Sequence, residues 1–178
     1  MVLQDGDILF QSLPHSELVD AIEGATDSPY SHCGIAHLTD HGWVVFEAIG
    51  PVKETALAVW IDQGRRSRYS VYRLREAYRE RIPAMIAAAY KYKGRPYDIH
   101  YEMDDKKIYC SELIYKAFKK ATGEELGQIV KLGSLNWGPH EHLIAAIEHG
   151  RIPVERPMIT PRALSEAKQL ELVARDVR

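Results

Sequence analysis

The fold of this chain is decided by the stretch Cys33-Gly-Ile-Ala-His-Leu-Thr-Asp-His-Gly-Trp-Val-Val-Phe-Glu-Ala-Ile49. Its two ends, Cys33 to Leu38 and Trp43 to Ile49, are rich in β-branched, aromatic and other apolar residues, which favours strands. The segment Thr39 to Gly42 between them is short, polar and closed by glycine, as hairpin turns are. We therefore predict an antiparallel hairpin over this stretch.

The register of that hairpin decides which side chains share a face. If Leu38 pairs with Trp43, then Gly34 lies opposite Glu47 and His32 is a diagonal neighbour of Glu47, typically about 7–8 Å away at the backbone. A carboxylate in that place could hold the imidazole in one tautomer. A slip of one residue would turn Glu47 to the opposite face, where a glutamate on an edge strand simply reaches water.

The rest of the chain predicts a mixture of strands and helices. Short strands are expected at residues 7–11 and 69–74, and a short helix or turn at 55–63. Helical spacing of apolar residues and stop signals predict helices at 16–22, 79–93, 110–122 and 139–148, with a last helix after Thr160. Strands early and helices late favour an α+β fold with one central antiparallel sheet, in a single domain spanning 1–178.

Composition excludes several classes of protein. The 178 residues carry 23 basic and 25 acidic side chains, a formal net charge of −2, without the basic excess of a nucleic-acid binder. With two cysteines, the chain is no disulfide-stapled scaffold and has no four-cysteine zinc site. The sequence predicts no membrane span and a cytoplasmic location, although a chain that begins after a cleaved leader would look the same.

Cys110 is the first candidate for chemistry. It starts a well-marked helix, where free backbone N–H groups and the helix dipole stabilise a thiolate. It lies three and four positions before Leu113 and Ile114, so its side chain points with the apolar face into the protein. An inert core cysteine at a helix start fits the same position equally well.

His32 and Cys33 stand side by side at the mouth of the predicted hairpin. His32 could serve Cys110 as a base, or it could be a structural histidine bonded to a loop carbonyl. Cys33 points to the opposite face of the strand and is interpreted as a core residue. A zinc site of His32, Cys33 and Cys110 lacks a fourth ligand and the usual paired spacing, so no metal is predicted.

Five short motifs in one order resemble a known family. They are Gly6-Asp-Ile-Leu-Phe-Gln11, Tyr30-Ser-His-Cys-Gly-Ile35, Phe46-Glu-Ala-Ile49, Gly94-Arg-Pro-Tyr-Asp98 and Tyr109-Cys-Ser-Glu-Leu-Ile-Tyr115. The series is similar to the YiiX/YebB-like branch of the NlpC/P60 cysteine hydrolase superfamily, which is circularly permuted so that the histidine hairpin precedes the cysteine helix. The resemblance covers nearly the whole chain.

The resemblance implies a papain-like α+β fold and a set of roles. Cys110 would be the nucleophile, His32 the base and Glu47 the polar residue that orients the imidazole. Tyr97, in the Pro-Tyr pair that precedes the cysteine in unpermuted relatives, would help to bind the oxyanion. The implied chemistry needs neither a metal nor an organic cofactor.

The leading hypothesis is a cysteine hydrolase that cleaves an amide, peptide or related acyl bond through a thioacyl-enzyme intermediate. Its substrate could be a small molecule, a peptide or a lipid-derived acyl compound. One alternative is an acyltransferase or thioesterase of the lecithin:retinol acyltransferase type, which has the same order of histidine and cysteine. A second is a binding module that has kept the cleft without turnover.

Overall fold

A six-stranded antiparallel sheet forms the centre of the computed structural model, which describes residues 2–177. The strand order is β4-β3-β2-β1-β5-β8. The strands are β1 (Ile8–Gln11), β2 (His32–Thr39), β3 (Gly42–Ala48), β4 (Val52–Ala56), β5 (Tyr69–Leu74) and β8 (Leu170–Val177). Every neighbouring pair is antiparallel, which confirms the predicted α+β class.

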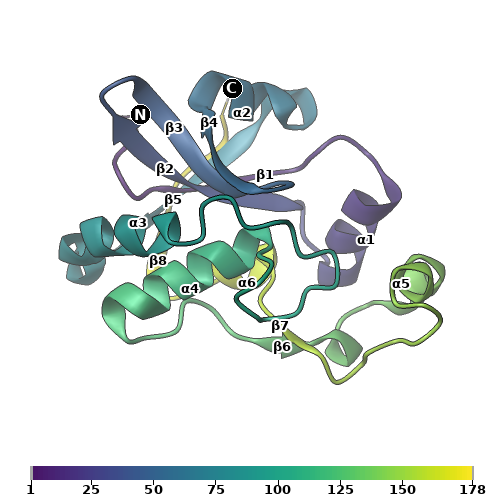
Figure 1. Cartoon of the computed structure of the whole chain (residues 1–178). Helices are drawn as coiled ribbons and strands as arrows, with labels where there is room; N and C mark the ends of the chain where they lie inside the picture. Colours follow the sequence, from purple (N-terminus) through teal and green to yellow (C-terminus); the bar gives the residue numbers. More distant parts are fainter. Residues whose placement is uncertain (1, 178) are drawn as a thin grey trace.

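Helices cover both faces of this sheet (Figure 1). They are α1 (Glu17–Thr26), α2 (Leu57–Gln63), α3 (Ile82–Tyr90), α4 (Cys110–Thr122), α5 (Glu141–Ile147) and α6 (Pro161–Ser165). In the view of Figure 1, α2 lies above the sheet and α3 and α4 lie below it, while α5 stands out to the side. A small second sheet pairs β6 (Val130–Lys131) with β7 (Pro157–Met158).

Four short 3₁₀ helices complete the described chain: η1 (Arg65–Ser67), η2 (Glu76–Arg81), η3 (Leu132–Ser134) and η4 (Gly138–His140). Two of them extend the predicted helices. The helix expected at 79–93 begins with η2 and continues as α3, and the one expected at 139–148 begins with η4 and continues as α5. Short 3₁₀ turns are common at the ends of α-helices.

The central strands are buried on both faces because each face has its own core. On the α2 side, Leu9, Val45 and Trp60 belong to one buried apolar cluster. On the α3 and α4 side, Phe10 and Phe46 belong to a larger cluster. Neighbouring residues of one strand thus serve opposite cores, as the alternation of side chains along a strand requires.

The hairpin closes in the predicted register. Leu38 pairs with Trp43, and Gly34 pairs with Glu47. The strands extend further toward the turn than expected, to Thr39 and Gly42, so the connection is two residues long. The register therefore brings Glu47 to the same face as Val45, whose Cγ1 atom occupies the space beside Gly34.

Two strands at the edges of the sheet were not predicted. The segment expected to begin a helix or turn at Thr55 starts instead inside β4, and α2 follows it directly. The C-terminal strand β8 was missed as well. Both sequences are rich in charged residues, which hides the alternation of a strand but suits an edge that must resist pairing with other chains.

Gly34 lies where the hairpin strands approach closely, and we expect Gly34→Ala to destabilise the fold. A Cβ atom there would overlap Val45 Cγ1 and lie 3.1 Å from the Phe46 carbonyl oxygen. Overpacking of this kind costs about 1–3 kcal/mol. Urea unfolding measures the effect, with Gly138→Ala as the control because a Cβ at Gly138 meets no described atom within 4 Å. Equal unfolding midpoints for the two variants would contradict the prediction.

Candidate active site

Cys110 is the first residue of α4, and the local sequence holds it there. Glu112 accepts a hydrogen bond from the backbone N–H of Tyr109 (3.2 Å), which satisfies one of the free donors at the helix start. Leu113 and Ile114 are completely buried and fix the rotation of the helix about its axis. The Cys110 side chain is thereby directed inward, as predicted, and is 3% exposed.

His32 is the first residue of β2 and contacts two of the predicted partners. Its Nε2 atom lies 2.5 Å from Glu47 Oε2. Cys110 is close enough to the same imidazole to raise its pKa, and the other ring nitrogen, Nδ1, is free of the contact with Glu47. The structure thus brings Cys110, His32 and Glu47 together in the order that the sequence suggested.

Glu47 is a carboxylate with no solvent exposure, and it is surrounded by donors. Besides His32, it accepts a hydrogen bond from Thr55 Oγ1 to Oε1 (2.5 Å) and one from Gln63 Nε2 to Oε2 (3.1 Å). Burial alone would raise the pKa of Glu47, but His32 and these two donors outweigh burial and lower it. Glu47 is therefore an ionised group inside the protein.

The charge of Glu47 is matched by His32. Burial on its own would lower the pKa of the imidazole, yet hydrogen bonds and charges from Cys110 and Glu47 together raise this pKa to about 9. At neutral pH the imidazole is thus protonated. An imidazolium beside a cysteine at a helix start favours the thiolate form of that cysteine.

Cys33 has a larger part in this arrangement than the sequence suggested. It is completely buried among core residues, as predicted, and it lies close enough to Cys110 to affect the pKa of that thiol. Cys33 is the largest cause of a pKa of Cys110 well below the ordinary range, followed by burial, which raises this pKa, and by His32, which lowers it. The interpretation of Cys33 as a core residue agrees with its burial, and both thiols are free.

Tyr97 lies close enough to this site for the charge of Cys110 to affect the pKa of its hydroxyl. Burial first, then neighbouring Tyr101 and the charge of Cys110 raise the pKa of Tyr97, so its hydroxyl stays protonated. The hydroxyls of Tyr97 and Tyr101 are 3.1 Å apart. Tyr101 was not predicted, and its left-handed backbone (φ 55°) left no signal in the sequence.

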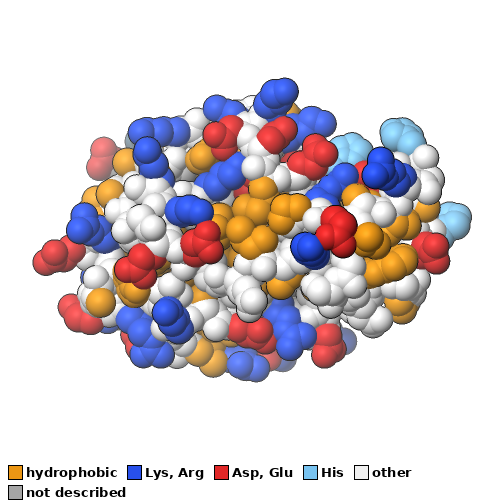
Figure 2. Space-filling view, turned by 90° about the horizontal axis from the view of Figure 1, so that it is seen from below, with side chains coloured by type: hydrophobic (Ala, Val, Ile, Leu, Met, Phe, Trp, Pro, Cys, Tyr) orange, Lys and Arg blue, Asp and Glu red, His pale blue; other side chains and the backbone are white. Residues whose placement is uncertain are grey.

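A pocket of about 100 Å³ opens on Cys110 and is lined mainly by apolar side chains. Its apolar walls come from α1, α5 and the segments around η3 and β7. These side chains are Leu18, Ala21, Ile22, Ala25, Ile99, Leu132, Leu135, Leu143, Ile144, Ile147, Pro153, Met158, Ile159 and Pro161. Seen from below, apolar side chains are also exposed on the side of the molecule where α5 lies (Figure 2). The surroundings of the thiol are therefore strongly hydrophobic.

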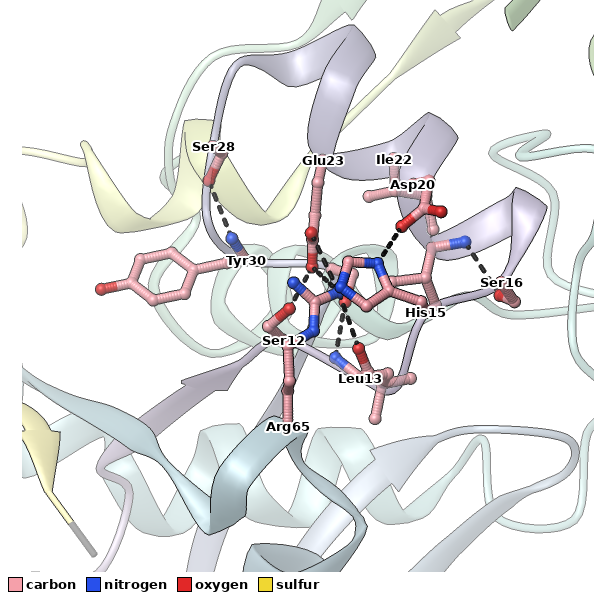
Figure 3. Close-up of polar contacts among 12 residues, drawn as sticks. Ser12, Leu13, His15, Ser16, Asp20, Ile22, Glu23, Ser28, Tyr30 and Arg65 are labelled. Carbon is pink, nitrogen blue, oxygen red and sulfur yellow. Dashed lines mark hydrogen bonds and ion pairs between the residues drawn. The ribbon is translucent and has the colours of Figure 1, made fainter.

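Polar contacts hold the α1 wall of this pocket in place (Figure 3). Ser16 accepts the backbone N–H of Val19 (3.2 Å) and caps the helix. Glu23, on α1, accepts hydrogen bonds from the hydroxyl of Ser12 and from Arg65 Nη2 (3.2 Å). Because Ser12 follows β1 and Arg65 follows α2, these contacts tie α1 to the sheet end that carries His32.

The α5 wall is held by a second polar cluster. Arg156 forms a two-pronged pair with Glu148, including Nη2 to Oε2 at 2.9 Å, and Glu148 Oε1 lies 3.0 Å from His100 Nδ1. Arg156 also donates to the backbone oxygen of His100 (2.6 Å). The end of α5 is thereby joined to the loop that carries Tyr97 and Tyr101.

The donor side chains do not form a metal site. Within residues 2–177, no three His, Cys, Asp or Glu side chains converge as ligands would. The same part of the chain contains no helix with the length and hydrophobicity of a transmembrane span.

Comparison with known proteins identifies the class that this fold and this cysteine–histidine site define. The model of the Peptidase_C92 family, permuted papain-like amidases of the YaeF/YiiX type, matches residues 2–174, and the chain belongs to this family. The uncharacterized protein YiiX of Escherichia coli K12 is 35% identical over 176 residues, which cover 97% of this chain and 87% of YiiX.

A solved structure agrees with the family. The crystal structure of yiiX from Escherichia coli O157:H7, described there as a metalloprotein, superposes with a TM-score of 0.89 at 34% identity and covers 98% of both chains. The donors of the present chain do not fit a metal centre, as described above. The permuted order of hairpin and helix, which the sequence motifs suggested, is thus confirmed by the family and by the fold.

We expect Cys33→Ala to raise the pKa of the Cys110 thiol, because the Cys33 side chain is the largest cause that lowers this pKa. The rate of alkylation by iodoacetamide, measured against pH, would then rise at a higher pH than in the unmodified protein. Cys33→Ser, which keeps a donor, is the matched control. Superposable profiles for Cys33→Ala and the unmodified protein would show that Cys33 has no such effect.

Proposed function

We propose that this protein is a cysteine amidase in which Cys110 is the nucleophile, His32 the acid and base, and Glu47 the residue that orients His32. The observation that carries the proposal is the buried pair of His32 and Glu47, 2.5 Å apart, beside the Cys110 thiol, which raises the pKa of the imidazole. Membership of an amidase family supports amide hydrolysis over acyl transfer to a lipid.

The first half of the reaction forms the acyl-enzyme. The Cys110 thiolate attacks the carbonyl carbon, a C–S bond forms, and the carbonyl oxygen takes the negative charge. The His32 imidazolium gives its proton to the leaving nitrogen, the C–N bond breaks, and the amine departs. The raised pKa of His32, about 9, keeps that proton available at neutral pH.

Water completes the cycle. His32, now neutral, takes a proton from a water molecule whose oxygen attacks the thioester carbon. The C–S bond then breaks, the acid leaves, and the Cys110 thiolate and the imidazolium are restored. Glu47 accepts the hydrogen bond of Nε2 throughout and keeps Nδ1 directed to the reacting atoms.

Two kinds of donor support the oxyanion in this proposal. Backbone N–H groups at the first turn of α4 have no partner within the helix and are placed next to the thiol. Tyr97 keeps its hydroxyl proton and lies within the electrostatic reach of Cys110. Its contact with the hydroxyl of Tyr101 restricts its orientation.

The pocket indicates the kind of acyl group that fits. Its walls offer few hydrogen-bond partners and many aliphatic side chains, so a polar or charged acyl group would lose its hydration without compensation. An apolar chain gains about 0.8 kcal/mol for each methylene group that it buries. We therefore propose amides of apolar carboxylic acids as the substrates.

We expect the protein to hydrolyse medium-chain acyl amides to free acid and amine, and Cys110→Ser to abolish turnover. The rate should fall at acidic pH as Cys110 takes up a proton, and above about pH 9 as His32 loses the proton that the leaving nitrogen needs. Liquid chromatography of acid and amine, with and without a lipid alcohol as acceptor, measures the reaction. Transfer of the acyl group to the alcohol in preference to water would contradict the proposal.

A large side chain that fills the pocket should slow the hydrolysis of apolar substrates and leave the reactivity of the Cys110 thiol unchanged. Ile144 lies on α5 and lines the pocket, so Ile144→Trp should lower kcat/KM for a medium-chain amide by about tenfold or more. Alkylation of Cys110 by the small reagent iodoacetamide should keep its rate. Ala146→Trp, at an exposed position of the same helix, is the control and should leave both rates unchanged.

A further inference from the structure

Two neutral side chains complete the surroundings of Glu47, and both come from elements that carry no other part of the site. Thr55 Oγ1, on β4, donates to Oε1 at 2.5 Å. Gln63 Nε2, at the end of α2, donates to Oε2 at 3.1 Å. Each carboxylate oxygen thus has a donor in addition to the bond that Oε2 makes with His32.

The sheet register explains how Thr55 reaches Glu47. Lys53 pairs with Glu47 across β3 and β4, and Thr55 pairs with Val45. Thr55 is therefore the diagonal neighbour of Glu47 on the same face of the sheet. The short side chain of Thr55 can bridge the distance between diagonal neighbours because the glutamate side chain is long. Thr55 is buried, so water does not compete for its hydroxyl.

Helix α2 contacts both ends of the histidine–carboxylate pair. Trp60 is completely buried, and its ring centre lies 6.1 Å from that of His32. Gln63, one turn further along α2, reaches Glu47. The packing of Trp60 against the sheet thereby fixes where the amide of Gln63 can lie.

We propose that Thr55 and Gln63 are positioning residues for the reaction: they fix the rotation of the Glu47 carboxylate and keep it ionised, so that His32 is oriented toward Cys110. This inference rests on the proposed function of the site. Both residues act through Glu47 and are placed beyond contact with a substrate.

The need for such donors follows from burial. An ionised carboxylate without water requires hydrogen bonds to its remaining lone pairs, since a single partner leaves it poorly solvated and free to rotate. Thr55 and Gln63 supply these bonds without a positive charge that would compete with His32 for Glu47. Among the ionisable groups around Glu47, His32 is bonded to it, Cys33 is buried close by, and Lys53 opposite it is exposed to solvent.

Alkylation of Cys110 by iodoacetamide, followed against pH, tests the inference on the full chain. In the unmodified protein we expect a plateau of fast alkylation between the pH at which Cys110 loses its proton and the pH at which His32 does. Thr55→Val and Gln63→Leu should narrow the plateau from both sides, with the acid midpoint higher by about one pH unit. Without these hydrogen bonds, the Glu47 carboxylate is less fully ionised and less well oriented, so it stabilises the His32 imidazolium less. A less stable imidazolium in turn stabilises the Cys110 thiolate less.

Matched variants separate positioning from general damage. Thr55→Ser keeps the hydroxyl and should restore the unmodified profile. Thr122→Val removes a threonine hydroxyl that donates to the Phe118 backbone oxygen (2.9 Å) near the end of α4, and it should leave both midpoints unchanged. A structural effect of losing a threonine would lower the amplitude or the stability without moving the midpoints.

The possible results distinguish this inference from the proposed function. If the unmodified protein lacks the plateau, both the proposed function and the inference are overturned. If the plateau is present and the pH profiles of Thr55→Val and Gln63→Leu coincide with the profile of the unmodified protein, the inference alone is overturned. Should Thr55→Val fail to fold, Gln63→Leu, at a half-buried helix end, decides the outcome by the same criterion.

Discussion

The buried contact between His32 Nε2 and Glu47 Oε2, at 2.5 Å, is the interaction on which the rest of the site depends. A fully buried carboxylate is costly unless a partner and further donors replace its hydration. The chain meets this requirement with His32 and with donors from β4 and α2. The same contact determines the chemistry, because it leaves Nδ1 of the imidazole for Cys110.

This constraint explains why the sheet is covered on both faces near strands β2 and β3. On one face, α2 packs Trp60 beside His32 and closes the space around Glu47. On the other face, the first turn of α4 brings Cys110 toward β2, where the Cys33 side chain lowers the pKa of Cys110. His32, at the end of the central strand β2, thus lies close to side chains from the helices on both faces of the sheet. Neither layer alone would complete the site.

The sequence predicted the hairpin register, and with it the His32–Glu47 pair, because apolar alternation and a glycine-ended turn leave few other pairings. It also placed Cys110 at a helix start, from capping and periodicity. Thr55 and Gln63 could not be found in this way: β4 is charged and resembles a loop, and its pairing to β3 depends on contacts distant from the local pattern. Alternation likewise assigned Cys33 to the core correctly, but it carries no information about which helix packs above the strand.

Burying the charges of the site lowers the stability of the fold, and interactions elsewhere in the protein must compensate. The pKa values of Glu47 and Cys110 are both lowered, which favours two buried anions beside the single positive charge of His32. Pairs or triads of buried charges contribute little net stability compared with apolar residues of similar size. The apolar clusters on the two faces of the sheet supply that stability. Neutral donors hold the excess negative charge without competing for His32: Thr55 and Gln63 each donate a hydrogen bond to Glu47, and they leave the imidazolium free to interact with both anions.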